Sequence, residues 1–394
     1  MDNEEHAKLF NRKAVIVTGE LSGEVHALHL INAINDVLPL QWSGIGSERL
    51  RQAGVDILYD YRSISLTGLS EIFSKMGQIS KAFKTLKKHL REASPSLLIL
   101  VDFPGFNLRV AAIARRLGIP VIYFIPPQVW AWRKGRMLRI KRDVALVICI
   151  LPFEKSLYEE HAVPSVYIGH PFMQTVSPLR TKEAFLSSLG LEQSKPVITI
   201  MPGSRENEIT KHVPVMLHVI GLLRRDLKNM AVLLPVAENI DRYFIETLVR
   251  DDPQIKLVQG ASHEALASSD IALVASGSAT LEAAILDCPA VVIYKVSALS
   301  YAAARLLVKI DYISLPNLIA GKQVFPEFIQ ALEPETIAER VLHVLHNETT
   351  RMKQDMEVVR KRLGTFDSYA LARDAVIQFL EQTYGPLFQT SSVS

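Results

Sequence analysis

The chain has few of the features that mark secreted, membrane-spanning or nucleic-acid-binding proteins. It carries two cysteines in 394 residues, Cys149 and Cys288, and both lie in apolar stretches. This is typical of reduced core thiols rather than a disulfide framework. No apolar run approaches the roughly 18 residues that span a bilayer, and the best, 144–152, is far shorter. The net charge of +3 is too small to favour nucleic acid as a partner, and no zinc-ligand spacing or long basic tail is present.

The chain instead has the composition of an ordinary globular protein. Hydrophobic residues make up 48% and charged residues 22%. The first residues, Met1–His6, are polar and acidic and lack the apolar core of a secretory signal. We therefore expect a cytoplasmic protein whose contact with a membrane, if any, is peripheral. At this length two domains of roughly 150 to 200 residues are expected.

Short apolar runs alternate with longer helical patterns in two successive series. Such alternation predicts an α/β fold made of two Rossmann-like, doubly wound domains. We expect residues 1–172 to form the N-terminal domain, 173–365 the C-terminal domain, and 366–394 a helix and polar tail, with the helix packing back on the N-terminal domain. The expected strands are 14–17, 97–101, 121–124 and 144–148, then 197–200, 231–234, 271–274 and 290–293.

The loops after these strands are the candidate sites, because parallel sheets bind ligands beyond the carboxyl ends of their strands. Pro202–Glu208 forms such a turn and leads into a helix. The first amides of a helix lack intrahelical partners and carry partial positive charge, so together with Arg205 they suit a diphosphate. Val274–Glu282 repeats the pattern, and Glu282, one turn inside its helix, is placed to hold a ribose.

Two loops of the N-terminal domain carry candidate acids. Thr18–Glu24 has two glycines that permit close backbone approach, although an ordinary capped helix start is the alternative. Asp102 follows a fully apolar strand, where partial burial would raise its basicity as a general base requires. The alternative is that Asp102 caps a helix beginning near Asn107. The segment Gly44–Gly46 lacks a third glycine and is interpreted as a turn.

Three further segments leave alternatives open. Pro126–Arg133 holds two tryptophans that are expected either to pack between the domains or to line a sugar site. The loop at 312–321 contains Asn317, which either contacts a ligand or is structural. Residues 72–90 place apolar side chains on one helical face, which core packing usually explains. Lysines around apolar first turns also suit an anionic membrane surface. The candidate membrane contacts are Leu69, Ile72, Phe73, Met76 and Ile79.

A series of short motifs lies along the chain over about residues 14–365. In chain order they are Gly19-Glu20 with Ser22-Gly23, Gly68-Leu69 with Glu71, Asp102 with Phe106-Asn107, Val129-Trp130-Ala131-Trp132-Arg133, Leu151-Pro152-Phe153-Glu154, Gly169-His170-Pro171, Pro202-Gly203-Ser204-Arg205, Ser276-Gly277 with Leu281-Glu282, and Ser314-Leu315-Pro316-Asn317. Together these motifs resemble the lipid-A-disaccharide synthase family. The resemblance implies a GT-B glycosyltransferase with two facing Rossmann-like domains and a C-terminal helical segment.

The family's activity implies the substrates and the partners. UDP-2,3-diacylglucosamine would be joined to 2,3-diacylglucosamine 1-phosphate, giving the β(1→6) disaccharide of lipid A and UDP, at the cytoplasmic face of the inner membrane. Asp102 would be the general base, and Arg205 would stabilise the leaving diphosphate. Because the chain has no Asp-x-Asp motif, we expect no metal and no cofactor. The residues implied to bind substrate are Glu20, Ser22, Gly23, Gly203, Ser204, Ser276, Gly277, Thr280, Glu282 and Asn317.

Two departures from the family pattern bear on the site. Glu24 stands where an aspartate is usual, and Gly105 stands where a second aspartate usually precedes Phe-Asn. Asp102 would then have to act without that second carboxylate. Two other functions stay open: another GT-B enzyme such as a UDP-N-acetylglucosamine 2-epimerase, and a non-catalytic UDP-sugar-binding protein at a membrane surface. Monomer and homodimer both stay open.

Overall fold

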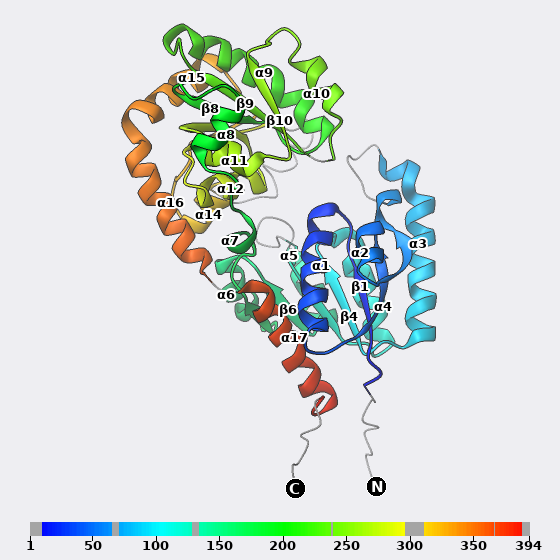
Figure 1. Cartoon of the computed structure of the whole chain (residues 1–394). Helices are drawn as coiled ribbons and strands as arrows, with labels where there is room; N and C mark the ends of the chain where they lie inside the picture. The colour runs from blue at the N-terminus through cyan, green and yellow to red at the C-terminus, as the bar shows by residue number, and fades with distance from the viewer. Residues whose placement is uncertain are drawn as a thin grey trace, which may run out of the picture. The chain divides into compact units, whose positions relative to one another are not determined.

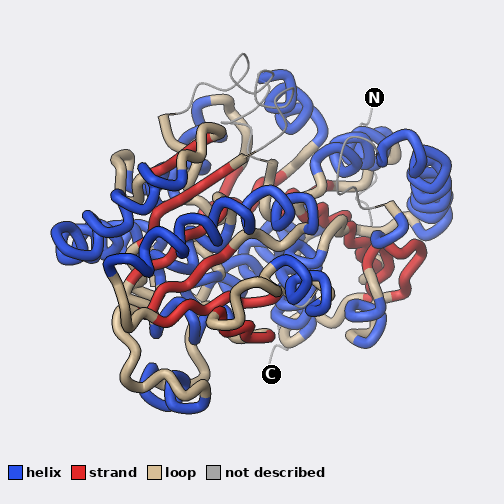
Figure 2. The backbone as a smooth tube through the Cα atoms, turned by 90° about the horizontal axis from the view of Figure 1, so that it is seen from above, coloured by secondary structure: helices blue, strands red, loops and turns tan. Residues whose placement is uncertain are grey.

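The computed structural model describes residues 10–64, 71–127, 134–237, 239–295, 311–365 and 367–387. They divide into two compact units. The first takes the chain up to Pro171 and again from residue 367, and the second is Phe172–Thr365. Each unit is built on its own parallel sheet, and Figure 2 shows the red strands running between blue helices.

The first unit has a seven-stranded sheet in the order β3-β2-β1-β4-β5-β6-β7, with every neighbouring pair parallel. The strand order reverses where β1 lies beside β4, which makes this the topological switch point of the sheet. The elements are β1 (Lys13–Val17), α1 (Leu21–Asn35), β2 (Gln41–Gly46), α2 (Glu48–Gln52), β3 (Asp56–Asp60), η1 (Tyr61–Ser63), α3 (Glu71–Ala93), β4 (Leu97–Val101), α4 (Pro104–Arg116), β5 (Val121–Phe124), α5 (Lys134–Asp143), β6 (Leu146–Cys149), α6 (Pro152–Glu160), β7 (Ser165–Tyr167) and α17 (Ser368–Tyr384).

Successive side chains of these strands point to opposite faces of the sheet. Val15, Leu98 and Tyr123 lie in one buried core with residues of α3, α4 and α5. Phe124, next to Tyr123, points the other way, and its ring centroid lies 6.4 Å from that of His26 on α1. Both faces of the sheet are therefore covered, which is why its strands are apolar on both sides.

The C-terminal helix α17 belongs to the first unit and lies beside α1 (Figure 1). The hydroxyl of Tyr369 is 2.8 Å from Nδ1 of His26, and its ring stacks on His29 at 4.7 Å between centroids. At the other end of the helix, Tyr384 donates a hydrogen bond to the carbonyl of Ser96 at 2.8 Å. The helix is thus held to this unit at both of its ends.

The second unit repeats the same winding with a six-stranded parallel sheet in the order β10-β9-β8-β11-β12-β13. Its switch point lies between β8 and β11, and α8 and α11 cover one face (Figure 1). The elements are α7 (Phe172–Thr175), α8 (Lys182–Ser188), β8 (Val197–Met201), α9 (Glu206–Asp226), β9 (Ala231–Val236), α10 (Arg242–Leu248), β10 (Ile255–Gln259), α11 (Ser262–Ser268), β11 (Ile271–Ala275), α12 (Ser278–Ile285), β12 (Ala290–Tyr294), α14 (Leu315–Ala320), β13 (Glu327–Ile329), α15 (Pro334–His343), the π-helical turn η2 (Val344–Glu348) and α16 (Thr349–Leu363).

The expected fold class, two doubly wound α/β units with a helical C-terminal segment, is confirmed. The interpretation of Gly44–Gly46 as a turn is wrong, because these residues form the end of β2. A Cβ at Gly44 would lie 1.8 Å from the carbonyl oxygen of Ile16 on β1. Glycine here marks a close approach between two strand backbones. Within the described ranges, no helix is both long and apolar enough to cross a membrane.

Candidate functional site

The predicted site loops of each unit gather at its topological switch point. In the first unit, Gly19–Gly23 follows β1 and Asp102 follows the adjacent β4. The two loops touch, because a Cβ built on Gly23 would lie 3.9 Å from Cβ of Asp102. In the second unit, Pro202–Arg205 follows β8, and Ser276-Gly277 follows the adjacent β11. Each unit thus places two candidate loops side by side where doubly wound sheets bind ligands.

Asp102 is half-buried and lies in an unusual backbone conformation. Its φ is 46°, and φ of the next residue, Phe103, is 48°, so two successive residues other than glycine are left-handed. The helix α4 begins at Pro104, three residues before the expected start, and its N-cap is Phe103. The side chain of Asp102 is therefore not the N-cap of this helix.

Gly19 permits the loop after β1 to lie against the loop after β4. A Cβ at Gly19 would lie 2.1 Å from Cγ of Phe103, so any other residue would displace that ring. Beside it, Ser22 Oγ donates to Glu20 Oε1 at 3.2 Å. Ser22 is exposed and Glu20 is half-buried. Both side chains are thus in reach of a ligand at this edge of the sheet.

Glu24 is fully buried and has a structural role. Its carboxylate accepts hydrogen bonds from the backbone N–H of Ser47 at 2.5 Å, from Ser47 Oγ at 2.7 Å and from Tyr61 Oη at 3.3 Å. Burial and the nearby carboxylate raise the pKa of Tyr61 to about 12. A glutamate is therefore accommodated at this position because it reaches across to the start of α2.

The turn after β8 presents Arg205 at the N-terminus of α9. Its side chain is 50% exposed, and Nη1 lies 3.1 Å from Oε1 of Glu208. Gly203 has φ of 122°, and a Cβ there would lie 2.6 Å from Glu208 Oε2, so glycine leaves room for this ion pair. The carbonyl of the exposed Ser204 accepts from Asn239 at 2.9 Å. The turn is thus fixed in shape while its cation faces solvent.

His212 holds the backbone of this turn, a role that was not predicted from the sequence. The side chain is fully buried on α9; Nδ1 lies 2.8 Å from the carbonyl of Pro202, and Nε2 accepts the backbone N–H of Lys295 at 3.0 Å. This pattern requires the neutral ring with its proton on Nδ1. Burial lowers the pKa of His212, which agrees with that tautomer. The imidazole ties the turn after β8 to the end of β12.

The loop after β11 places one carboxylate in a protected position. Thr280 is buried and donates from Oγ1 to the carbonyl of Gly277 at 2.7 Å. Glu282 is 15% exposed, and its Oε2 lies 3.7 Å from Nε2 of His263. Burial raises the pKa of Glu282, and His263 opposes this rise. Ser276 Oγ points to the carbonyl of Ile313 at 3.4 Å.

The side chain of Asn317 lies inside the fold, where it hydrogen-bonds to the backbone that follows α14. It is fully buried; Oδ1 accepts from the N–H groups of Val324 and Phe325, both at 2.8 Å, and Nδ2 donates to Phe325 O at 2.7 Å and to Glu327 Oε1 at 2.8 Å. Every polar group of the side chain is occupied. Asn317 therefore holds this loop, and its expected direct contact with substrate stays a prediction. Sequence reasoning also missed Glu327, which accepts from the N–H groups of Ile313 and Ser314.

The predicted membrane stripe is described only in part. Met76 is 57% exposed on α3, whereas Ile79 packs partly buried against the core of the first unit. Leu69 and the tryptophan loop Val129–Arg133 lie outside the described residues, as do the side chains of Ile72 and Phe73. The same helix carries exposed lysines along its solvent side.

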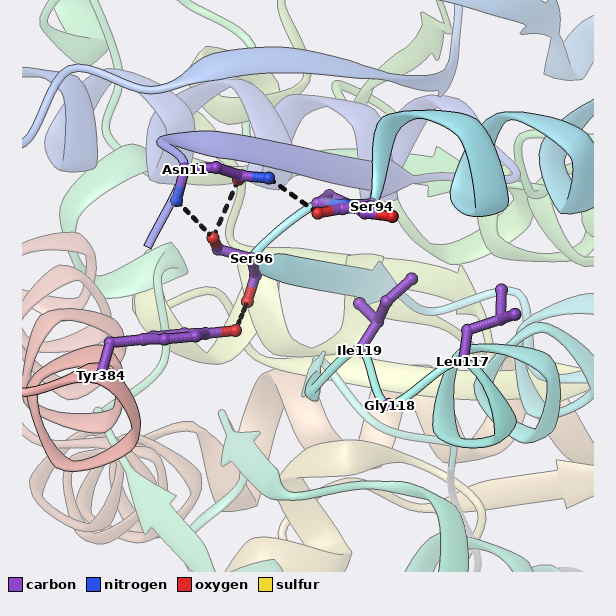
Figure 3. Close-up of a pocket in the computed structure, with 8 residues that line it drawn as sticks. Asn11, Ser94, Ser96, Leu117, Gly118, Ile119 and Tyr384 are labelled. Atoms are coloured by element: carbon purple, nitrogen blue, oxygen red, sulfur yellow. Dashed lines mark hydrogen bonds between the residues drawn. The ribbon is translucent and has the colours of Figure 1, made fainter. Parts of the chain in front are cut away.

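A cavity of about 280 Å³ lies at the opposite edge of the first sheet, at the amino ends of β1 and β4. Figure 3 shows Asn11, Ser94, Ser96 and Tyr384 joined by hydrogen bonds around it. These groups bond one another, so the cavity marks where α17 is tied to the sheet. In the part of the chain that the structure describes, no three His, Cys, Asp or Glu side chains gather as a metal site.

Comparison with known sequences identifies the family. The model of the family described as Lipid-A-disaccharide synthetase matches residues 14–378. The chain belongs to the lipid-A-disaccharide synthase family. The lipid-A-disaccharide synthase of Syntrophus aciditrophicus is 39% identical over 360 residues, which is 90% of this chain and 94% of that protein. That of Myxococcus xanthus is 38% identical over 373 residues, 93% and 97% of the two chains.

Solved structures show the GT-B fold class that is expected of a lipid-A-disaccharide synthase. UDP-GlcNAc 2-epimerase from Neisseria meningitidis bound to UDP-GlcNAc has a TM-score of 0.59 at 16% identity, and the comparison covers 93% of this chain and all of that one. The S. aureus MnaA–UDP structure has a TM-score of 0.63 at 15% identity, covering 95% and 97%. At these identities the likeness concerns the fold, and the family assignment carries the activity.

Proposed function

We propose that the chain is the glycosyltransferase that forms the lipid A disaccharide, joining UDP-2,3-diacylglucosamine to 2,3-diacylglucosamine 1-phosphate. The observation that supports the catalytic roles is that the switch point of each unit presents one side chain that the reaction needs. A half-buried carboxylate, Asp102, follows β4, and a half-exposed cation, Arg205, begins α9. The first suits an acceptor that must lose a proton, and the second suits a departing diphosphate.

The proposed donor site uses the second unit. Arg205 and the amides at the start of α9 face the diphosphate, where they oppose the negative charge that grows as UDP leaves. Glu206 and Glu208 in the same turn offset the partial positive charge at the N-terminus of α9, so the guanidinium of Arg205 supplies most of the positive charge there. Glu282, protected beside His263, is proposed to accept hydrogen bonds from the ribose.

The proposed acceptor site uses the first unit. Asp102 takes the proton of the acceptor's 6-hydroxyl while that oxygen attacks the anomeric carbon of the donor sugar. The new C–O bond forms as the bond to the diphosphate oxygen breaks, and UDP leaves with the electron pair. Attack opposite UDP inverts the anomeric centre and gives the β(1→6) linkage. Glu20 and Ser22, beside Asp102 at the same sheet edge, are proposed to bind the acceptor.

An assay with purified protein tests this function. The UDP-diacylglucosamine donor is incubated with and without the monosaccharide phosphate, and UDP and the lipid product are followed. Release of UDP that requires acceptor and yields disaccharide supports the proposal. A sugar epimerised without acceptor would indicate the epimerase alternative, and binding without turnover would indicate a non-catalytic protein.

Two variants test the residue roles. Asp102→Asn should lower kcat by about 10²- to 10⁴-fold, the range of a positioned general base, and unchanged turnover would remove Asp102 from the mechanism. Arg205→Ala should lower kcat by about 10²-fold or more. Arg242→Ala is the matched control, since Arg242 also pairs with a glutamate on a helix of the second unit, Glu246 at 2.8 Å. Equal losses in both arginine variants would contradict a specific role for Arg205.

The same proposal includes peripheral binding to the inner face of the cytoplasmic membrane through α3. It is supported by the exposed Met76 among lysines on that helix. Met76→Ser should reduce co-flotation with vesicles that contain anionic lipid. Leu179→Ser is the control, because Leu179 is an equally apolar residue that is 90% exposed and belongs to the second unit rather than to α3. Equal effects of the two substitutions would contradict a surface centred on α3.

A further inference from the structure

The backbone C=O and N–H of Asp102 are both hydrogen-bonded to neighbouring elements. Its carbonyl oxygen accepts a hydrogen bond from Tyr123 Oη at 2.7 Å and a second from Asn107 Nδ2 at 2.7 Å. Its N–H points to the carbonyls of Phe124 and Ile125, at 3.4 and 3.3 Å. Tyr123 and Asn107 are both fully buried, so neither exchanges these bonds for water.

The bonds hold a backbone that side chains normally avoid. Asp102 and Phe103 are both left-handed, and Ile125, at the end of the adjacent strand β5, has φ of 55°. A β-branched residue at positive φ is a marked outlier, and such conformations persist where the surroundings impose them. Asp102, Phe103 and Ile125 thus place three left-handed residues at the ends of two neighbouring strands, where the proposed general base lies.

We propose that Tyr123 is a positioning residue: its hydroxyl, with Asn107, locks the left-handed Asp102–Phe103 turn and so fixes the direction in which the carboxylate of Asp102 points. This inference rests on the proposed function, because it assigns Tyr123 an effect through Asp102. The ring of Tyr123 lies in the core of the first unit, and its hydroxyl donates to the backbone carbonyl of Asp102 in the loop that presents the acid. A base displaced by about 1 Å loses much of its rate advantage.

Tyr123→Phe tests the inference, because it removes one oxygen and keeps the ring. We expect kcat to fall about 10- to 100-fold, while KM for both substrates stays within about threefold. Tyr158→Phe is the matched control. Tyr158 is fully buried in the same core, and its hydroxyl donates to the carbonyl of Pro127 at 3.4 Å instead. The kcat of the Tyr158→Phe enzyme should differ from that of the parent by less than about threefold. A folded Tyr123→Phe enzyme with kcat within threefold of the parent would overturn the inference.

A double-variant comparison separates positioning from general loss of structure. In an Asp102→Asn background, Tyr123→Phe should cause no further loss of turnover; a further tenfold loss would show that Tyr123 acts elsewhere and would overturn the inference. If Asp102→Asn alone turns over normally, the proposed base fails and Tyr123 has nothing to position. If Asp102→Asn is inactive and Tyr123→Phe is normal, only the inference fails.

A second pair of variants applies even if Tyr123→Phe does not fold. Phe103→Asn and Phe103→Val both remove the ring, but asparagine adopts the left-handed region readily and valine does not. The asparagine variant should turn over at least tenfold faster than the valine variant. Equal rates in the two would show that the left-handed turn does not control the base.

Discussion

The first unit should lose stability in mild acid because it holds one buried imidazole, His170, and one half-buried imidazole, His26, both neutral in the fold. Burial lowers the pKa of His26 to about 4, with His29 as a second cause, and lowers that of His170 to about 3, with His26 as a second cause. The ordinary value is 6.5, so both rings are neutral in the folded protein at pH 5 and charged in the unfolded chain. Because the pKa of each histidine is lower in the folded protein than in the unfolded chain, its contribution to stability is fully present above pH 6.5. That contribution is lost as the pH falls from 6.5 towards the folded-state pKa values of about 4 and 3.

The size of this loss follows from proton linkage. Between pH 7.5 and pH 5.0 each ring contributes about 2 kcal/mol, so the free energy of unfolding should fall by about 4 kcal/mol for the pair. Asp60, whose pKa the neighbouring Arg62 lowers, adds its loss only at more acid pH. With an m value of about 2 kcal/mol per molar, the urea midpoint should move down by about 2 M.

Tryptophan fluorescence reports this transition selectively, because all three tryptophans of the chain precede Pro171. Urea titrations at pH 7.5 and 5.0 would give the two midpoints. His170→Gln should halve the shift to about 1 M, whereas His161→Gln, at an exposed position on the same unit, should keep all of it. A shift below about 0.5 M in the parent protein would refute the argument that the fold keeps both rings neutral at pH 5.

Two further predictions concern stability. Gly44→Ala should destabilise the first unit by more than about 3 kcal/mol, because the added Cβ would meet the backbone of Ile16. Gly105→Ala is the control: a Cβ there meets nothing within 4 Å, so this variant should be neutral or stabilising by up to about 1 kcal/mol. Urea midpoints from tryptophan fluorescence measure both effects, and equal effects would contradict the close approach of β1 and β2 at Gly44. Asn317→Ala should cost the second unit about 4 kcal/mol by leaving buried N–H groups such as that of Phe325 unpaired, measured as a lower thermal midpoint by circular dichroism. An unchanged midpoint would contradict the role of Asn317 in holding this loop.

The central strands were predictable because their apolar runs are buried on both faces. Leu97–Val101 and Val121–Phe124 have the predicted bounds. The bounds of the other central strands differ from the predicted ones by one or two residues at an end. The outer strands β2, β3, β7, β10 and β13 escaped prediction because they are short or because polar residues and glycine interrupt their apolar patterns. Gly44 is the clearest case: its place in β2 depends on how closely β1 approaches, which only the assembled sheet determines.

The positions of the candidate loops were predictable, but the roles of their residues were less so. Asp102 and Arg205 follow apolar strands, and the parallel order places those strand ends at the switch points. His212 gave no such signal, since it lies on the apolar face of a helix, where a histidine usually belongs to the core. It is in the core, yet both of its ring nitrogens hold the backbone of the turn that presents Arg205.

Polar residues in these loops therefore divide by what their hydrogen bonds hold. Asn317 and Glu24 are buried with their polar atoms engaged inside the fold, whereas Asp102 and Arg205 keep part of their side chains at the surface. In sequence both kinds look alike, because both are polar residues close to the start of a helix. The distinction appears only when each donor and acceptor is followed to its partner. A motif in such a loop thus specifies the shape of the loop as much as its chemistry, and a substitution at Asn317 is expected to act through that shape.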